Sequence, residues 1–270
     1  MLNLFKSAAS SICFFSITLS SLFVSHDIAY SQVGIAPIII EKEASRGRVE
    51  SVINVINTGD KTIRVRIFSQ SFIYTQEGKF KILSTNKQDL SPYLQFSPRE
   101  LSIAPKSTRK IRLLTLLDPN LPDAEYRAVI FAEHLIQNNS QNGGSVGMIT
   151  RVGTTMYVKK GSQSPSLVVD NSNFNKGIQR LRLLVKNQGN ASVRPSVSWT
   201  LKQNGKLVRE GKTIPATIIT RTSRYIPLED LSKNSSLIPP GKYELNGYLI
   251  WRENNEDRSL AFQLPVNISQ

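Results

Sequence analysis

The stretch Ser145–Lys159, SVGMITRVGTTMYVK, predicts more about the fold of this chain than any other. Its residues fall into two alternating sets, which are Val146, Met148, Thr150, Val152, Thr154, Met156 and Val158, and Gly147, Ile149, Arg151, Gly153, Thr155, Tyr157 and Lys159. Successive strand side chains point to opposite faces, so this pattern predicts a strand. The run is more than twice the usual strand length of about 5–6 residues. One part could therefore close a sandwich while another part stays an edge that pairs with another chain. The alternative is an ordinary core strand after a polar loop.

Short alternating runs separated by turn residues continue on the N-terminal side. Pro37, inside the apolar run 33–40, predicts an edge strand or a strand that switches sheets. Asn57–Asp60 is a strong turn cluster, and Tyr126–Ile136 is another extended run. We find no convincing helical stripe, so the pattern indicates an antiparallel β-sandwich.

The C-terminal half has the same character. Gly161–Pro165 is a short polar linker, and Asn204-Gly205 lies between two strand-like runs, as in a hairpin. Trp199 and Trp251 are expected core aromatics, with ligand platforms as the alternative. The chain is therefore expected to be all-β, with one sandwich over residues 32–160 and a second over 161–270.

Residues 1–31 have the features of a secretory signal peptide. Lys6 gives a positive start, Ala8–Val24 is apolar and small, and Ala29–Ser31 offers small residues for cleavage. An uncleaved N-terminal helix is the alternative. The only cysteine, Cys13, lies within this segment, so the mature chain cannot form an internal disulfide. We expect an exported protein held together by its cores.

The chain is strongly basic, with 34 Lys and Arg against 20 Asp and Glu and a net charge of +14. These cations are scattered along strand-like runs, and no basic tail, zinc spacing or helix–turn–helix pattern accompanies them. Solvated sheet faces and attraction to acidic partners explain this better than nucleic-acid binding.

Residues that could carry enzymatic chemistry are sparse. Gly143–Gly147, GGSVG, fits G-x-S-x-G, but a nucleophile elbow needs a strand before the motif and a helix after it. Here a polar loop precedes Ser145 and a strand follows it. His134 is the only histidine of the mature chain, and no clustered metal ligands are seen. We expect no enzyme activity, cofactor or metal, and a secreted hydrolase using Ser145 is the remote alternative.

Several blocks resemble the PapD-like family of periplasmic pilus-assembly chaperones, and they are GIAPIII, SVINVINTGDKTIRVRI, FSPRELSIAPKSTRKIRLL, LPDAEYRAVIF and the long strand ending in MYVKK. The resemblance covers the first mature domain well and the second by architecture only. It implies two immunoglobulin-like sandwiches in an L or boomerang arrangement. It also implies a non-catalytic function in fimbria assembly, which is to lend a strand to an exported pilin subunit that lacks its last one. An outer-membrane usher is implied as a further partner, and the periplasm as the location.

The resemblance also assigns roles to particular residues. The donor residues would be Val146, Met148, Thr150 and Val152. The family's carboxylate anchor, an Arg and a Lys, falls near Ile39 and Thr155, and neither is basic here. Arg151 shares a strand face with Thr155 and is a candidate substitute cation. Lys159 matches a basic residue that the family keeps toward the domain interface.

The alternative hypothesis is a structural or adhesive envelope protein, built from immunoglobulin-like domains, that is not a chaperone. Such a protein would have no free donor strand.

Overall fold

The computed structural model describes residues 33–135, 149–175, 177, 179–229 and 238–268. The predicted signal segment and part of the predicted donor stretch lie outside these ranges. The described residues form strands and one 3₁₀ turn, η1 (Ser91–Tyr93), and none of their helices could cross a membrane. The all-β class expected from the sequence is confirmed.

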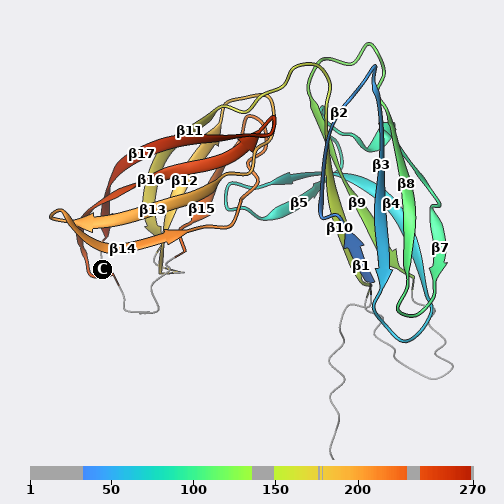
Figure 1. Cartoon of the computed structure of the whole chain (residues 1–270), viewed down its shortest axis with the longest axis horizontal. Helices are drawn as coiled ribbons and strands as arrows, with labels where there is room; N and C mark the ends of the chain where they lie inside the picture. Colours follow the sequence, from blue (N-terminus) through green and yellow to red (C-terminus); the bar gives the residue numbers. More distant parts are fainter. Residues whose placement is uncertain (1–32, 136–148, 176, 178, 230–237, 269–270) are drawn as a thin grey trace, which may run out of the picture. The chain divides into compact units, whose positions relative to one another are not determined.

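Two sheets face each other in the first sandwich (Figure 1). In pairing order, the first sheet contains β1 (Val33–Ala36), β3 (Arg48–Asn57), β8 (Thr108–Leu116) and β6 (Leu94–Ser97). The second contains β2 (Ile39–Glu43), β10 (Arg151–Lys159), β9 (Glu125–His134), β4 (Ile63–Tyr74) and β5 (Phe80–Leu83), with β7 (Glu100–Ile103) also paired to β4. One apolar cluster, which includes Ile53, Ile130 and Met156, joins the two sheets.

The second sandwich is built in the same way. One sheet contains β11 (Leu167–Asn175), β12 (Arg180–Asn187) and β15 (Ser223–Pro227). The other contains β14 (Lys206–Lys212), β13 (Ser196–Gln203), β16 (Gly241–Glu253) and β17 (Glu256–Ile268). Trp199 is buried in the core between them, and Trp251 is partly buried against it. Both tryptophans therefore have the packing role that we expected.

Two local predictions from the sequence are confirmed. The chain leaves the first sheet at Ala36 and enters the second at Ile39, so Pro37 marks a change of sheet. Asn204 and Gly205 have φ of 50° and 77° between β13 and β14, as expected for a tight hairpin turn.

The two sandwiches repeat two polar devices. Tyr126 Oη donates a hydrogen bond to the Pro122 carbonyl at 2.8 Å, and Tyr243 Oη donates to the Pro239 carbonyl at 2.8 Å. Each bond ties the start of a strand to the backbone four residues upstream, as in the tyrosine corner of immunoglobulin-like sandwiches. The motif is LPDAEY in the first sandwich and IPPGKY in the second.

The second device is a buried asparagine at the end of a strand. Asn57 Nδ2 donates to the carbonyls of Lys61, Ile103 and Ala104, and its Oδ1 accepts from Gly59 N–H at 2.9 Å. Asn187, also 0% exposed, repeats this pattern. Its Nδ2 donates to the carbonyls of Ala191 and Ile218, and its Oδ1 accepts from Gly189 N–H. The amide side chain thus replaces ladder bonds that the turn cannot make.

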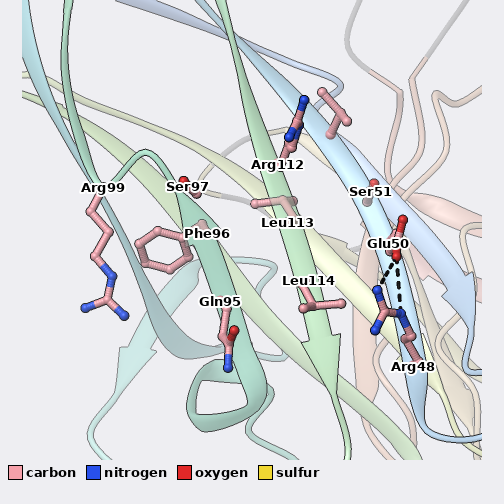
Figure 2. Close-up of a pocket in the computed structure, with 11 residues that line it drawn as sticks. Arg48, Glu50, Ser51, Gln95, Phe96, Ser97, Arg99, Arg112, Leu113 and Leu114 are labelled. Carbon is pink, nitrogen blue, oxygen red and sulfur yellow. Dashed lines mark hydrogen bonds and ion pairs between the residues drawn. The ribbon is translucent and has the colours of Figure 1, made fainter.

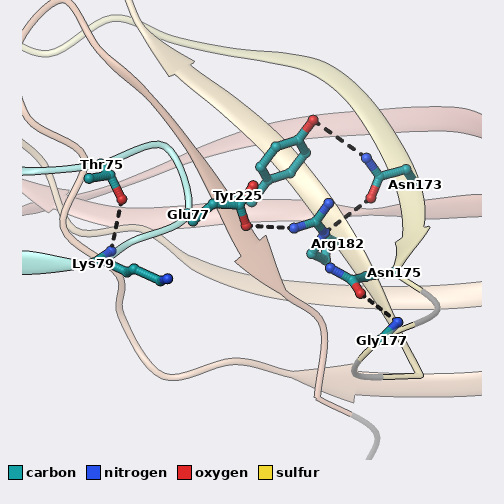
Figure 3. A network of polar contacts seen from close by, with 8 residues as sticks. All are labelled: Thr75, Glu77, Lys79, Asn173, Asn175, Gly177, Arg182 and Tyr225. Atoms are coloured by element: carbon teal, nitrogen blue, oxygen red, sulfur yellow. Dashed lines mark hydrogen bonds and ion pairs between the residues drawn. The ribbon is translucent and has the colours of Figure 1, made fainter.

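The turn between β4 and β5 contacts the second sandwich (Figure 3). Arg182 of β12 donates from Nη1 to Glu77 Oε2 at 2.6 Å and from Nε to Asn173 Oδ1 at 3.1 Å. Its guanidinium lies 4.2 Å from the ring centroid of Tyr225. One arginine therefore joins the turn to two strands of the second sandwich.

Candidate functional site

The candidate site is the edge of β10 that faces away from β9. β9 pairs antiparallel with all of β10, from Arg151 to Lys159. On the other side β2 pairs in parallel, but only with Thr155–Lys159. Within the described residues, no strand pairs with Arg151–Thr154 on that side. The first four residues of β10 therefore form an unpaired sheet edge.

Backbone directions identify the groups exposed at this edge. The N–H of His134 in β9 donates to the carbonyl of Thr150, whereas the N–H of Thr155 donates to the carbonyl of Ile38 beside β2. Alternate residues of a strand direct their backbone groups to opposite sides. The N–H and C=O of Arg151 and Gly153 therefore point to the open edge, where an incoming strand could pair.

The two faces of β10 have different surroundings. Met156 and Val158 are fully buried in the core of the first sandwich, and Thr154 Oγ1 donates to the Pro37 carbonyl at 2.6 Å. On the outer face, Gly153 leaves room for the ring of Phe131. A Cβ at Gly153 would lie only 3.0 Å from that ring and from a methyl of Val129.

The predicted donor residues lie at the N-terminal end of this strand. Val146 and Met148 are outside the described residues. Thr150 is described but precedes β10, and it is part-buried. Val152 is partly buried and packs against the core of the first sandwich. Strand structure thus covers 151–159 of the stretch that we expected to be one long strand.

Ile39 and Thr155, where the family's anchor residues would fall, are neighbours in register on β2 and β10. Ile39 is 38% exposed and Thr155 is 9% exposed. The structure therefore places the two positions side by side at the point where the open edge ends.

Arg151 lies on the same face, four residues before Thr155. Its Nε donates to the carboxylate of Glu133 on β9, and its guanidinium lies 5.4 Å from the ring centroid of Phe68. The Arg151 side chain is still 49% exposed, whereas that of Glu133 is 11% exposed. Arg151 is therefore a partly neutralised cation beside the open edge.

A second cation near the Ile39–Thr155 pair was not predicted from the sequence. Arg194 precedes β13, and its guanidinium lies 4.6 Å from the ring centroid of Tyr157 while Nη1 donates to Glu41. Tyr157 and Glu41 are the next outward-facing pair after Thr155 and Ile39. Nε and Nη2 of Arg194 are buried, and among the described residues they have no hydrogen-bond partner. A buried donor without an acceptor is costly.

Buried polar groups surround Arg194. Burial raises the pKa of Tyr157 to about 12, so its phenol stays protonated at physiological pH. Burial also raises the pKa of Glu125, although the N–H and hydroxyl of Ser192 both donate to its carboxylate. A cavity of about 600 Å³ adjoins these groups, and Lys159 lines it together with Tyr157 and Arg194.

Of the residues considered for enzymatic chemistry, His134 is described and Ser145 is not. Ser145 of the GGSVG motif lies outside the described residues. His134 ends β9. The described residues contain no group of three or more His, Cys, Asp or Glu that could hold a metal ion.

Comparisons with known proteins give a likeness in structure only. No protein-family model matches the chain, and no curated protein matches it. The solved class 5 fimbriae chaperone CfaA is similar at a TM-score of 0.49 and 14% identity, over 86% of this chain and 98% of that one. The chaperone YadV is similar at a TM-score of 0.49 and 13% identity, over 87% of this chain and 100% of that one. The Pseudomonas aeruginosa CupB2 chaperone is similar at a TM-score of 0.46 and 11% identity, over 85% of this chain and 99% of that one.

Proposed function

We propose that this protein is a periplasmic chaperone that binds an exported pilin-like subunit by adding a strand to it. The unpaired edge of β10 at Arg151–Thr154 is the observation that carries the proposal. An exposed sheet edge offers N–H and C=O groups to an extended partner, and the alternating side chains of the strand determine register. The order along the chain of the sequence blocks that resemble PapD-like chaperones supports the same function. The chaperone makes and breaks no covalent bond in this role.

In this proposal Met148 and Val146 would extend the strand when a subunit binds. Their side chains, with Thr150, would enter the groove of a subunit that lacks one strand. Gly153 has no side chain on the outer face, and Arg151 and Gly153 supply backbone groups for the ladder. The subunit remains covered until another strand replaces β10. We place an outer-membrane usher next in the assembly sequence because the resemblance implies one.

A subunit that pairs with this edge could end near Ile39 and Thr155, where its C-terminal carboxylate needs a cation. Two arginines are candidates. Both are partly neutralised, Arg151 by Glu133 and Arg194 by Glu41, but Arg194 also has two buried donors without partners among the described residues. We therefore assign the stronger contribution to Arg194, and a weaker one to Arg151 with the Thr155 hydroxyl.

Co-purification from gently extracted periplasm tests strand donation. The mature protein, tagged at its C-terminus, is compared with Val146→Lys/Met148→Lys and with the matched control Ile149→Lys, whose side chain is 65% exposed. We expect a small exported β-rich subunit with the wild type and the control, and its loss from the double variant. Circular dichroism and unfolding midpoints verify that the three proteins fold equally. The same partners in all three, or none in any, would leave a structural or adhesive sandwich protein instead.

The same assay separates the two arginines. Arg194→Ala is expected to lower subunit recovery by at least about tenfold, because a charged hydrogen bond is lost, and Arg151→Ala by less. A synthetic peptide matching the subunit's C-terminus, with and without amidation, supplies the second readout. If amidation leaves affinity for the wild type unchanged, no carboxylate anchor exists.

A further inference from the structure

A groove of about 710 Å³ lies on the outer face of the first sheet, across β3, β8 and β6 (Figure 2). It is on a different sheet from the open edge of β10. Its lining combines cations with apolar side chains, among them Arg48, Val52, Phe96, Arg99, Arg112 and Leu114. A solvent-facing sheet surface is usually polar, so this combination calls for an explanation.

The apolar part forms the base of the groove. Val52 of β3 is 43% exposed, and Leu114 of β8 is half-buried one row away. The register places Val52 beside Arg112, and Arg112 beside Ser97 of β6. Apolar side chains therefore lie directly next to a guanidinium and to hydroxyl groups.

The cations are unevenly neutralised. Arg48 forms an ion pair with Glu50 on the same strand. Arg99 lies 5.6 Å from the ring centroid of Phe96, and Figure 2 shows Arg99 and Arg112 on different sides of that ring. In the part of the chain that the structure describes, neither Arg99 nor Arg112 has a carboxylate partner. The groove therefore carries two uncompensated positive charges around an apolar base.

We propose that this groove binds an extended acidic peptide segment of a partner protein, with an apolar side chain between two carboxylates. Arg99 and Arg112 would bind the carboxylates, since guanidinium forms strong bidentate bonds with them. The apolar side chain would contact Phe96, which Figure 2 shows between Arg99 and Arg112, and the neighbouring Leu114.

The position of the apolar groups favours a peptide over a membrane surface. A flat anionic bilayer would be met by apolar groups that protrude beyond a ring of cations. Here Phe96 and Leu114 are partly buried, and they line the groove together with Arg99 and Arg112. A single side chain can reach into such a groove, whereas a bilayer surface cannot.

A chemical-shift titration of the ¹⁵N-labelled mature protein tests the proposal. The probe is acetyl-Asp-Ser-Leu-Ser-Asp-amide, whose first, third and fifth side chains share one face when extended. We expect saturable shifts at the lining residues of β3, β6 and β8. Replacing both Asp by Asn, or Leu by Ser, should weaken binding by about tenfold, and added salt should weaken binding of the parent peptide.

Arg112→Ala should weaken binding of the same peptide by about tenfold. Arg109→Ala is the matched control, because Arg109 is exposed on the same strand but does not line the groove, and it should change the affinity by no more than about twofold. Equal affinity for the Asp and Asn peptides, an unaffected Arg112→Ala variant, or no saturation at millimolar peptide would overturn the proposal. So would shifts produced only by phosphatidylglycerol vesicles. These outcomes are independent of the β10 variants, because none of the titrated residues belongs to β10.

Discussion

The strands β10 and β17 occupy the same place in their sandwiches, yet they differ in the length of the preceding connection and in the groups exposed at their outer edges. Each strand follows the one that begins after a tyrosine corner. β17 is joined to β16 by the two-residue turn Asn254-Asn255 and pairs with it along all 13 residues. β10 is separated from β9 by residues 135–150, and its first four residues have no second partner among the described strands.

The outer edge of β17 is protected against pairing. Pro265 has no N–H to offer, and Glu256, Asp257 and Arg258 are charged and exposed at the other end of the strand. The open part of β10 contains Gly153 and Thr154 and a single charge, Arg151, which Glu133 already pairs. The same architecture therefore has one edge with features that disfavour strand addition and one edge that lacks them.

Removing the buried asparagines tests whether the two sandwiches really share one construction. Asn57→Ala and Asn187→Ala should each lower the free energy of unfolding by about 2–4 kcal/mol, because several buried backbone groups lose their partners. Urea unfolding followed by tryptophan fluorescence reports on the second sandwich, since both tryptophans, Trp199 and Trp251, lie there. Circular dichroism reports on both sandwiches.

Asn57→Ala should therefore shift the circular dichroism transition more than the fluorescence transition, and Asn187→Ala should shift both. A large loss for one variant and none for the other would mean that the repeated hydrogen bonds do not have the same role. Ser84→Ala, at an exposed site just after β5, serves as a control, and we expect no change in its free energy of unfolding.

Sequence patterns predicted the all-β class, the change of sheet at Pro37 and the Asn204-Gly205 hairpin, because each depends on neighbouring residues. The repeated tyrosine corner was not predicted from the sequence. LPDAEY and IPPGKY share only Pro and Tyr, with an aliphatic residue before the Pro, and so short a match does not stand out as a repeat. Arg194 could not be predicted. Its contact with Tyr157 and Glu41 joins segments that are distant in the chain, and only packing brings them together.

The outer face of β10 gives the next test of the comparison. Gly153→Ala should lower the free energy of unfolding by about 1 kcal/mol, because the new Cβ would meet the Phe131 ring at 3.0 Å and must displace it. Gly34→Ala on β1 is the matched control. Its Cβ would lie 3.5 Å from Ile56, an ordinary contact, so we expect a change within about 0.5 kcal/mol. Equal effects would mean that Phe131 moves without cost and that Gly153 is not required by packing.

The smallest expected effect concerns the opposite end of β9, where Glu125 is buried. Burial raises the pKa of Glu125 in the folded state. At a pH between the unfolded and the folded pKa, the folded chain therefore holds a proton on Glu125 that the unfolded chain has released. The stabilisation of the folded state by protonated Glu125 is therefore fully present below the unfolded pKa, near 4.5. It is lost as the pH rises through the raised pKa of the folded state.

Glu125→Gln keeps an oxygen that can accept from Ser192 and removes this titration. The free energy of unfolding of the wild type, relative to the variant, should consequently fall as the pH rises above about 4.5. Urea unfolding at several pH values measures the difference. If the wild type instead gains stability over the variant with rising pH, the bonds from Ser192 and the nearby arginines outweigh burial, and this end of β9 holds an ionised carboxylate.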